Sequence, residues 1–201
     1  MQKRQIKLRK MSGNQLYPVF LRLDKLKLLL VGGGAVAEEK LRFLHKSSPN
    51  AQVTIVAKEL HRDVMAIANK LSAQVFTRAF EDADATGFDL IIAATNDRAL
   101  NEQIWQAAKA NGILINVADT PDLCDFYMGG IVTRGDLKIA ISTNGKSPTL
   151  AKRLREFLED ILPEETDDLI QNLNIFRKQV KTSFAEKVKT LNDLTVSLIK
   201  K

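Results

Sequence analysis

The first half of the chain alternates short apolar runs with longer amphipathic stretches. Runs rich in Val, Ile and Leu predict five strands, at residues 27–31, 53–56, 74–77, 90–94 and 114–117. Between them, apolar residues recur every three or four positions, which predicts helices through residues 37–44, 60–71 and 97–110. Strands that alternate with helices indicate an α/β fold with a parallel sheet and right-handed crossovers.

The pattern changes after Asp119. Runs at 127–133 and 137–142 flank Arg134-Gly135-Asp136 and predict a hairpin with glycine in its turn. From Ser147 the chain is expected to be helical, with Ser147 as N-cap, Pro148 in the first turn and Pro163 ending the first helix. Later apolar residues keep helical spacing and predict one apolar stripe, made of Leu169, Leu173, Phe176, Val180, Phe184, Val188 and Leu191.

These patterns divide the 201 residues into three expected regions. A Rossmann-like domain is expected at 14–118, a β-hairpin region at 119–146 and a helical C-terminal module at 147–201. The hairpin leaves strand edges that a two-fold partner can cover, so we expect it to be a dimerisation region and the protein to be a homodimer.

Composition and charge narrow the class of protein. No apolar run approaches the roughly 20 residues of a membrane span, so no membrane segment is expected. The basic residues 1–13 lack the apolar segment of a secretory signal, and are either a solvated extension or an upstream start with Met11 as the internal alternative. Cys124 is the only cysteine and allows no intramolecular disulfide, which favours the cytoplasm.

The net charge of +6 admits three kinds of partner: nucleic acid, an anionic membrane surface or a polyanionic small molecule. Nucleic acid is the weakest of these, because basic residues are interspersed with acidic ones and no basic stripe with aromatic residues appears. A small-molecule ligand with several carboxylates is therefore one of the partners that the charge admits.

A glycine turn follows the first predicted strand. Gly32-x-Gly34-x-x-Ala37, between a strand and a helix, is the dinucleotide-binding fingerprint with alanine in third place. Gly32 permits the tight turn, Gly34 lets the backbone approach a pyrophosphate, and Ala37 keeps the helix close to the sheet. The helix start at Ala35 and Val36 offers unpaired N–H groups to phosphates. The alternative is a structural turn that binds no cofactor.

The acidic residue expected after the second strand is displaced. Ala57 and Lys58 come first, and Glu59 only then. Glu59 could bind a ribose hydroxyl or serve the following helix, and Lys58 could accept a 2′-phosphate.

A second loop with phosphate-binding character lies between the hairpin and the helical module. Gly145-Lys146-Ser147 resembles the end of a P-loop, but Ala140 stands where the first glycine is required, so a nucleotide triphosphatase is not expected. The loop Thr143, Asn144, Gly145, Lys146 and Ser147 could instead hold a substrate carboxylate at a helix N-terminus.

Polar residues follow the predicted strands at their carboxyl ends, where open α/β sheets bind ligands. Asp119 follows the fifth strand, and its alternative role is a turn before Thr-Pro. Thr95, Asn96 and Asn116 are expected cofactor contacts, with Asn96 alternatively capping a helix.

The two histidines and the cysteine are not expected to take part in catalysis or metal binding. His45 and His61 fall in the first two helical segments and are expected on ordinary surface away from the active end. Cys124 is expected to fill a small buried space. No cluster of His and Cys suggests a metal site.

Five ordered segments carry a resemblance to a known family: Tyr17–Phe20, Val31–Ala37, Ala93–Asn96, Asn116–Asp119 and Ile141–Pro148. Between Tyr17 and about Lys181 the chain resembles the precorrin-2 dehydrogenase/sirohydrochlorin ferrochelatase family, in the form found at the N-terminus of sirohaem synthases. The resemblance implies oxidation of precorrin-2 to sirohydrochlorin with hydride transfer to NAD, and some members also insert ferrous iron. It also implies a homodimer with a Rossmann domain, a small dimerisation region and a helical module.

The resemblance makes Asp119 the candidate acid/base beside the nicotinamide. A tetrapyrrole with many carboxylates would suit Lys146, Lys152, Arg153 and Arg155, whose alternative is a solvated helix face. Two other functions stay open: a non-enzymatic sensor that binds NAD, and a protein that only inserts metal.

Overall fold

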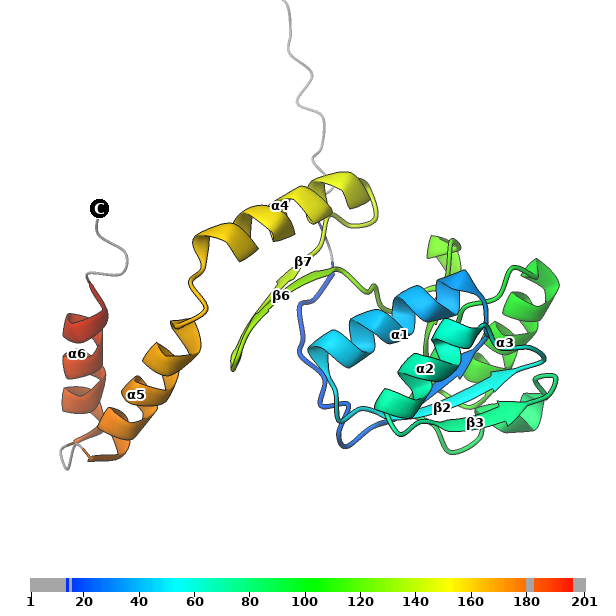
Figure 1. Ribbon diagram of the computed structural model, residues 1–201, viewed down its shortest axis with the longest axis horizontal. Helices are drawn as coiled ribbons and strands as arrows, with labels where there is room; N and C mark the ends of the chain where they lie inside the picture. The colour runs from blue at the N-terminus through cyan, green and yellow to red at the C-terminus, as the bar shows by residue number, and fades with distance from the viewer. Residues whose placement is uncertain (1–13, 15, 180–182, 197–201) are drawn as a thin grey trace, which may run out of the picture. The chain divides into compact units, whose positions relative to one another are not determined.

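A computed structural model describes residues 14, 16–179 and 183–196 (Figure 1). Contacts divide the chain into two compact units. The first contains the described residues up to Met128 together with Thr143–Lys146, and the second contains Gly129–Ser142 and the described residues from Ser147. The expected division at residues 118 and 146 stays a prediction, and the contacts group the hairpin with the helices that follow it.

The first unit is built on a parallel sheet of five strands. They are β1 (Lys27–Val31), β2 (Gln52–Ala57), β3 (Gln74–Thr77), β4 (Leu90–Ala93) and β5 (Leu114–Val117). Their order is β3-β2-β1-β4-β5, and all four pairings are parallel. The expected Rossmann-like sheet is confirmed. The chain moves outward in one direction from β1 to β3 and in the other from β4 to β5, so the strand order reverses between β1 and β4.

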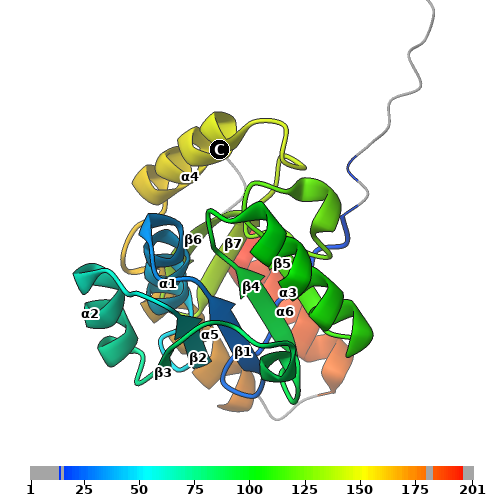
Figure 2. The same cartoon turned by 90° about the vertical axis from the view of Figure 1, so that its right-hand side faces the viewer.

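Three helices cover the two faces of this sheet. Helices α1 (Ala35–Ser47) and α2 (Arg62–Lys70) lie on one face, and α3 (Arg98–Ala110) lies on the other (Figure 2). Leu28 and Leu30 pack toward α1 and α2, while Leu29 and Val31 pack toward α3. Because β1 is buried on both faces, its sequence is a continuous apolar run rather than an alternating one.

The second unit begins with an antiparallel hairpin of β6 (Gly130–Arg134) and β7 (Leu137–Ile141). Only Gly135 and Asp136 form its turn, since Arg134 still pairs with Leu137. The Arg134 guanidinium donates from Nε to the Leu162 carbonyl at 3.1 Å, just beyond the end of the next helix. The turn is therefore held by the helical segment that follows it in sequence.

The tip of the hairpin also meets a later helix. The Asp136 N–H donates to Asp167 Oδ1 at 2.8 Å, and the Gln171 amide donates to Asp136 Oδ2 at 2.8 Å. Gly135 has a φ of +54°, and a Cβ built on it would lie 1.9 Å from Asp167 Cγ. Both the backbone angle and the neighbouring carboxylate exclude a side chain there.

The helical module contains α4 (Pro148–Ile161), α5 (Thr166–Gln179) and α6 (Phe184–Thr195). The expected start of α4 is confirmed, because the Ser147 hydroxyl accepts the Leu150 N–H at 3.2 Å and Pro148 opens the first turn. The helix ends at Ile161, shortly before Pro163, as expected. None of the helices in the described ranges is long and apolar enough to cross a membrane.

The apolar stripe expected from Leu169 to Leu191 is divided between two helices. Ser183 has non-helical backbone angles and caps α6, with Glu186 completing a reciprocal capping box. The predicted stripe therefore does not lie on one helix, because Ser-x-x-Glu supplies the hydrogen bonds of a new helix start. Val180, the basic residues 1–13 and the final lysines lie outside the described residues.

Candidate functional site

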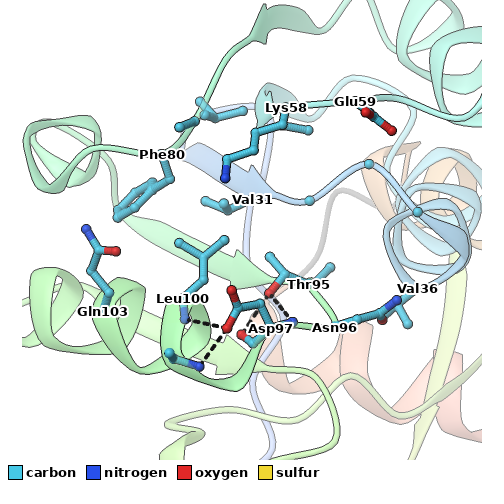
Figure 3. Close-up of a pocket in the computed structure, with 18 residues that line it drawn as sticks. Val31, Val36, Lys58, Glu59, Phe80, Thr95, Asn96, Asp97, Leu100 and Gln103 are labelled. Carbon is cyan, nitrogen blue, oxygen red and sulfur yellow. Dashed lines mark hydrogen bonds between the residues drawn. The ribbon is translucent and has the colours of Figure 1, made fainter.

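A pocket of about 570 Å³ lies at the carboxyl ends of β1, β2 and β4 (Figure 3). This is the edge where the strand order reverses, the position at which doubly wound sheets bind ligands. The volume falls within the roughly 300–1,000 Å³ typical of small-molecule and cofactor sites. Its walls come from the glycine turn, from the residues after β2 and β4, and from Phe80, Leu100 and Gln103.

The three glycines of the turn have different structural roles. Gly32 has a φ of +128°, and a Cβ there would lie 2.2 Å from the Ala94 carbonyl oxygen. A Cβ on Gly33 would lie 2.0 Å from the Glu59 carbonyl oxygen, a requirement that the fingerprint alone does not give. Among the described residues, a Cβ on Gly34 would have one other atom within 4 Å, His61 Cε1 at 4.0 Å. Gly32 and Gly33 therefore serve the packing of the turn, and Gly34 leaves its backbone open.

The glycine turn places the N-terminus of α1 at the pocket. Gly34 is the N-cap residue, and as a glycine it has no side chain to cap the helix. The first intrahelical bond runs from the Glu38 N–H to the Gly34 carbonyl at 3.0 Å, so the amides of Ala35, Val36 and Ala37 precede it. These amides and the helix dipole favour an anion, and a pyrophosphate fits this position.

Only some of the cofactor contacts that were predicted in the glycine turn line the pocket. Gly32, Gly34 and Val36 line the pocket, whereas Ala35 and Ala37 do not. Ala37 is fully buried against the sheet, as its place in the fingerprint requires.

The segment after β4 is fixed by a small polar network. The Thr95 hydroxyl donates to Asn101 Oδ1 at 2.7 Å, and the Asn101 amide donates to the Thr95 carbonyl at 3.1 Å. Asn101 is buried, and its polar side chain on an otherwise apolar helix face was the signal in the sequence. The network holds Thr95 at the pocket wall.

Asp97 caps helix α3. Its carboxylate accepts the N–H groups of Ala99 at 2.9 Å and Leu100 at 3.2 Å, as the dashed lines in Figure 3 show. The alternative that Asn96 caps this helix is therefore wrong, because the helix begins one residue later than expected. Asn96 lines the pocket beside Thr95, so the structure brings these two predicted contacts together with the glycine turn.

The residues after β2 reach the pocket in different ways. The Lys58 side chain points into it toward Val31 and Phe80, whereas Glu59 lies on the side of the glycine turn (Figure 3). His61 donates its backbone N–H to the Gly33 carbonyl at 2.9 Å. The expectation that His61 lies away from the active end is wrong, because α2 begins beside the glycine turn.

Asn116 does not line the pocket. Its amide donates to the Phe126 carbonyl at 2.8 Å and thereby ties the segment after β5 to the strand. Its role as a cofactor contact stays a prediction.

Cys124 makes similar structural contacts. Its sulfur accepts the Val117 N–H at 3.2 Å, and its S–H lies within bonding distance of the carbonyls of Val117 and Thr120. Burial raises the pKa of the Cys124 thiol, so the group stays protonated at neutral pH.

Asp119 stands in the turn that leaves β5. The Ala118 N–H still pairs with the Ala93 carbonyl at 2.9 Å, and the Thr120 N–H bonds back to Val117 at 3.3 Å. Asp119 itself has a φ of +55°, a left-handed conformation that Asp tolerates better than most residues. In the described part of the chain its exposed carboxylate has no hydrogen-bond or ion-pair partner, and Asp119 is not among the residues that line the pocket.

The loop predicted to bind substrate has left-handed residues at its centre. Asn144 has a φ of +54° and Gly145 a φ of +70°, and the Lys146 N–H bonds to the Thr143 carbonyl at 3.1 Å. Thr143–Lys146 belong to the same compact unit as Asp119, while Ser147 begins a segment of the other.

The basic residues of α4 are engaged along their own helix. Arg153 pairs with Glu156 at 3.1 Å, Lys152 lies 3.9 Å from the same carboxylate, and Arg155 pairs with Glu159. Such pairs favour the solvated-face alternative for these residues. Within the described ranges, no group of three or more His, Cys, Asp or Glu side chains is placed to hold a metal ion.

Comparison with known proteins gives two family matches. Residues 19–130, more than half of the chain, match the family described as "Putative NAD(P)-binding". Residues 134–161 match the family described as "Sirohaem biosynthesis protein central".

Curated relatives and a solved structure agree with these matches. A siroheme synthase from Methylococcus capsulatus is 40% identical over 84% of this chain and 35% of its own length. One from Vesicomyosocius okutanii is 40% identical over 84% of this chain and 36% of its own. A solved structure described as "SirC, precorrin-2 dehydrogenase" has a TM-score of 0.74 and 27% identity over 89% of both chains. The chain spans about a third of the length of these curated relatives.

Proposed function

The chain belongs to the NAD(P)-binding family that its residues 19–130 match, and on this premise we propose that it oxidises precorrin-2 to sirohydrochlorin with NAD as the hydride acceptor. This reaction is a step of sirohaem biosynthesis. The observation that carries the proposal is the open pocket beside Gly34 and the uncapped start of α1, at the switch point of the sheet. The structural likeness to SirC over most of both chains supports the choice of substrate.

The chain's own residues supply binding and proton transfer. The amides at the start of α1 bind the pyrophosphate, and Asn96 and the Thr95 segment bound the far wall of the pocket. When bound, NAD accepts the hydride. The Asp119 carboxylate takes up a proton or steadies positive charge on the tetrapyrrole as the hydride leaves, because it is exposed and unpaired in the described part of the chain.

We assign substrate carboxylates to the loop Thr143–Ser147. In this proposal, backbone N–H groups of the left-handed turn at Asn144 and Gly145 bind a substrate carboxylate, and Lys146 adds a positive charge that attracts it. The net charge of +6 favours a substrate with several carboxylates.

We also propose that the protein is a cytoplasmic homodimer. Helix α4 leaves Leu150, Leu154, Phe157 and Ile161 exposed at helical spacing, and the two-stranded sheet of β6 and β7 keeps free edges in the described part of the chain. A two-fold partner covering these surfaces would remove both from water. The presence of a single cysteine supports a reducing compartment.

One assay tests the function. The purified chain is given precorrin-2 with and without NAD, and the absorption spectrum is followed; the expected result is formation of sirohydrochlorin only with NAD. A protein that binds NAD without turning over precorrin-2 would be the non-enzymatic sensor. Addition of ferrous or cobaltous ion to sirohydrochlorin without NAD then decides whether the chain also inserts metal or only inserts metal.

A further inference from the structure

We infer that Lys58 forms a binding site for a phosphate on the 2′ position of the adenosine ribose, so that the pocket binds NADP as well as NAD. The inference rests on the proposed dinucleotide site and adds a specificity-determining residue to it. NAD remains the expected oxidant, and Lys58 reduces the difference in affinity between NAD and NADP.

The position of Lys58 in the fold is the first argument. In doubly wound sheets, an acidic residue after the second strand bonds to the ribose 2′-hydroxyl, and a basic residue there accommodates a 2′-phosphate. Strand β2 ends at Ala57, and Lys58 is the next residue. The chain therefore places a positive charge where NAD-specific sites carry a negative one.

The direction of the side chain is the second argument. Lys58 lines the pocket and points into it, between Val31 and Phe80 (Figure 3). In the described part of the chain its amine has no hydrogen-bond or ion-pair partner, so the charge is available to a ligand. Buried Phe80 and Val31 form apolar surface next to it, while Lys58 itself is exposed, so a ligand can reach its amine from solvent.

The other charged groups nearby do not cancel this charge. Asp97 also lines the pocket, but its carboxylate is occupied as the cap of α3. Arg78, which follows β3, is held by Asp84 at 2.7 Å and does not supply a competing cation. Glu59 is the remaining charged residue of the pocket lining, and its backbone is held against Gly33 on the other side of the turn.

The test compares two probes that differ only in the 2′-phosphate. The full chain, Lys58→Ala and Lys58→Glu are titrated calorimetrically with 2′,5′-ADP and with 5′-AMP, and then with NADP and NAD. Loss of a charge-assisted contact should weaken 2′,5′-ADP and NADP on the order of 10- to 100-fold in Lys58→Ala, and more in Lys58→Glu. Binding of 5′-AMP and NAD should change less than about threefold, because their 5′-phosphate groups are bound by amides of α1.

Glu59→Gln is the matched control, since it removes the neighbouring charge and leaves Lys58 in place. It should not weaken 2′,5′-ADP. An equal loss for both probes in Lys58→Ala would assign the lysine to the pyrophosphate and overturn the inference, as would no loss at all. If the unmodified chain binds neither NAD nor NADP, the dinucleotide site itself is wrong; if NAD binds and precorrin-2 is oxidised while Lys58 has no selective effect, only this inference falls.

Discussion

Gly33 and Gly34 are adjacent, yet substitutions at the two positions should have opposite effects. A Cβ on Gly33 would lie 2.0 Å from the Glu59 carbonyl oxygen and 3.0 Å from Leu60 Cα. Both are backbone atoms, so the turn or the start of α2 has to move. Among the residues that the structure describes, a Cβ on Gly34 meets only His61 Cε1 at 4.0 Å, and the extended backbone of Gly34 suits any residue.

The sizes of the two effects follow from these contacts. Forcing a methyl group into a packed region costs about 1–3 kcal/mol. For a chain of this length each kcal/mol lowers the melting temperature by about 2–4 °C, so Gly33→Ala should lower it by about 2–12 °C. Gly34→Asp should not lower it, because Asp is a favoured N-cap residue and its charge complements the dipole of α1. The same carboxylate repels the pyrophosphate and should abolish NAD binding.

Two measurements on each variant decide the matter: thermal unfolding followed by circular dichroism, and NAD binding by titration. Gly33→Ala with an unchanged melting temperature would contradict the packing argument. A folded Gly34→Asp protein that binds NAD as the unmodified chain does would falsify the position of the cofactor.

Four further predictions address other parts of the molecule. Asp119→Asn should keep the melting temperature and NAD affinity but lose on the order of 10²–10⁴ in precorrin-2 turnover; a stable variant with unchanged turnover would remove Asp119 from the chemistry, and a destabilised one with unchanged turnover would make it a turn residue. Cys124 should react slowly with iodoacetamide at pH 7, because burial raises the pKa of its thiol; labelling as fast as a free thiol would contradict this. Sedimentation at micromolar concentration should show a dimer, and Phe157→Glu on the exposed face of α4 should yield monomers; a monomeric unmodified chain refutes the assembly. The hydrogen bond from Arg78 lowers the pKa of Asp84, so its contribution to stability is present above the usual Asp pKa and is lost as the pH falls through the lowered value; Asp84→Asn should therefore reduce the drop in melting temperature between pH 5 and pH 2, and an unchanged drop would mean that the pair does not stabilise the fold.

The sheet and the glycine turn were accessible from sequence because both depend on local patterns. Strand β5 has the predicted bounds, 114–117, since a short apolar run buried on both sides is distinctive. The sequence also contains a signal for the start of α6, the capping box Ser183-x-x-Glu186. The apolar residues keep helical spacing across this point, so periodicity alone does not reveal the helix start. The capping hydrogen bonds at Ser183 therefore determine where α6 begins, and the apolar spacing does not.

Side-chain directions at the pocket were less accessible. Whether Asn96 or Asp97 caps α3 depends on a one-residue shift of the helix start, which composition does not determine. The direction of Lys58 and the closeness of His61 to Gly33 depend on how α2 packs beside the glycine turn, a contact between separate segments. The polar side chain of Asn101 on an apolar helix face does not by itself identify its partner, because its hydrogen bonds to Thr95 form only when α3 lies on the sheet.

The Arg-Gly-Asp tripeptide at the hairpin tip has a consequence for how variants of this protein are compared. Asp136 and Asp167 are 31 positions apart, yet the Asp167 side chain fills the space above Gly135 and accepts the Asp136 N–H. A side chain at 135 would displace that carboxylate, whereas a smaller residue at 167 would leave the turn amide without its acceptor. Residues 135 and 167 are therefore coupled, and the effects of substitutions at the two positions on stability are not expected to add.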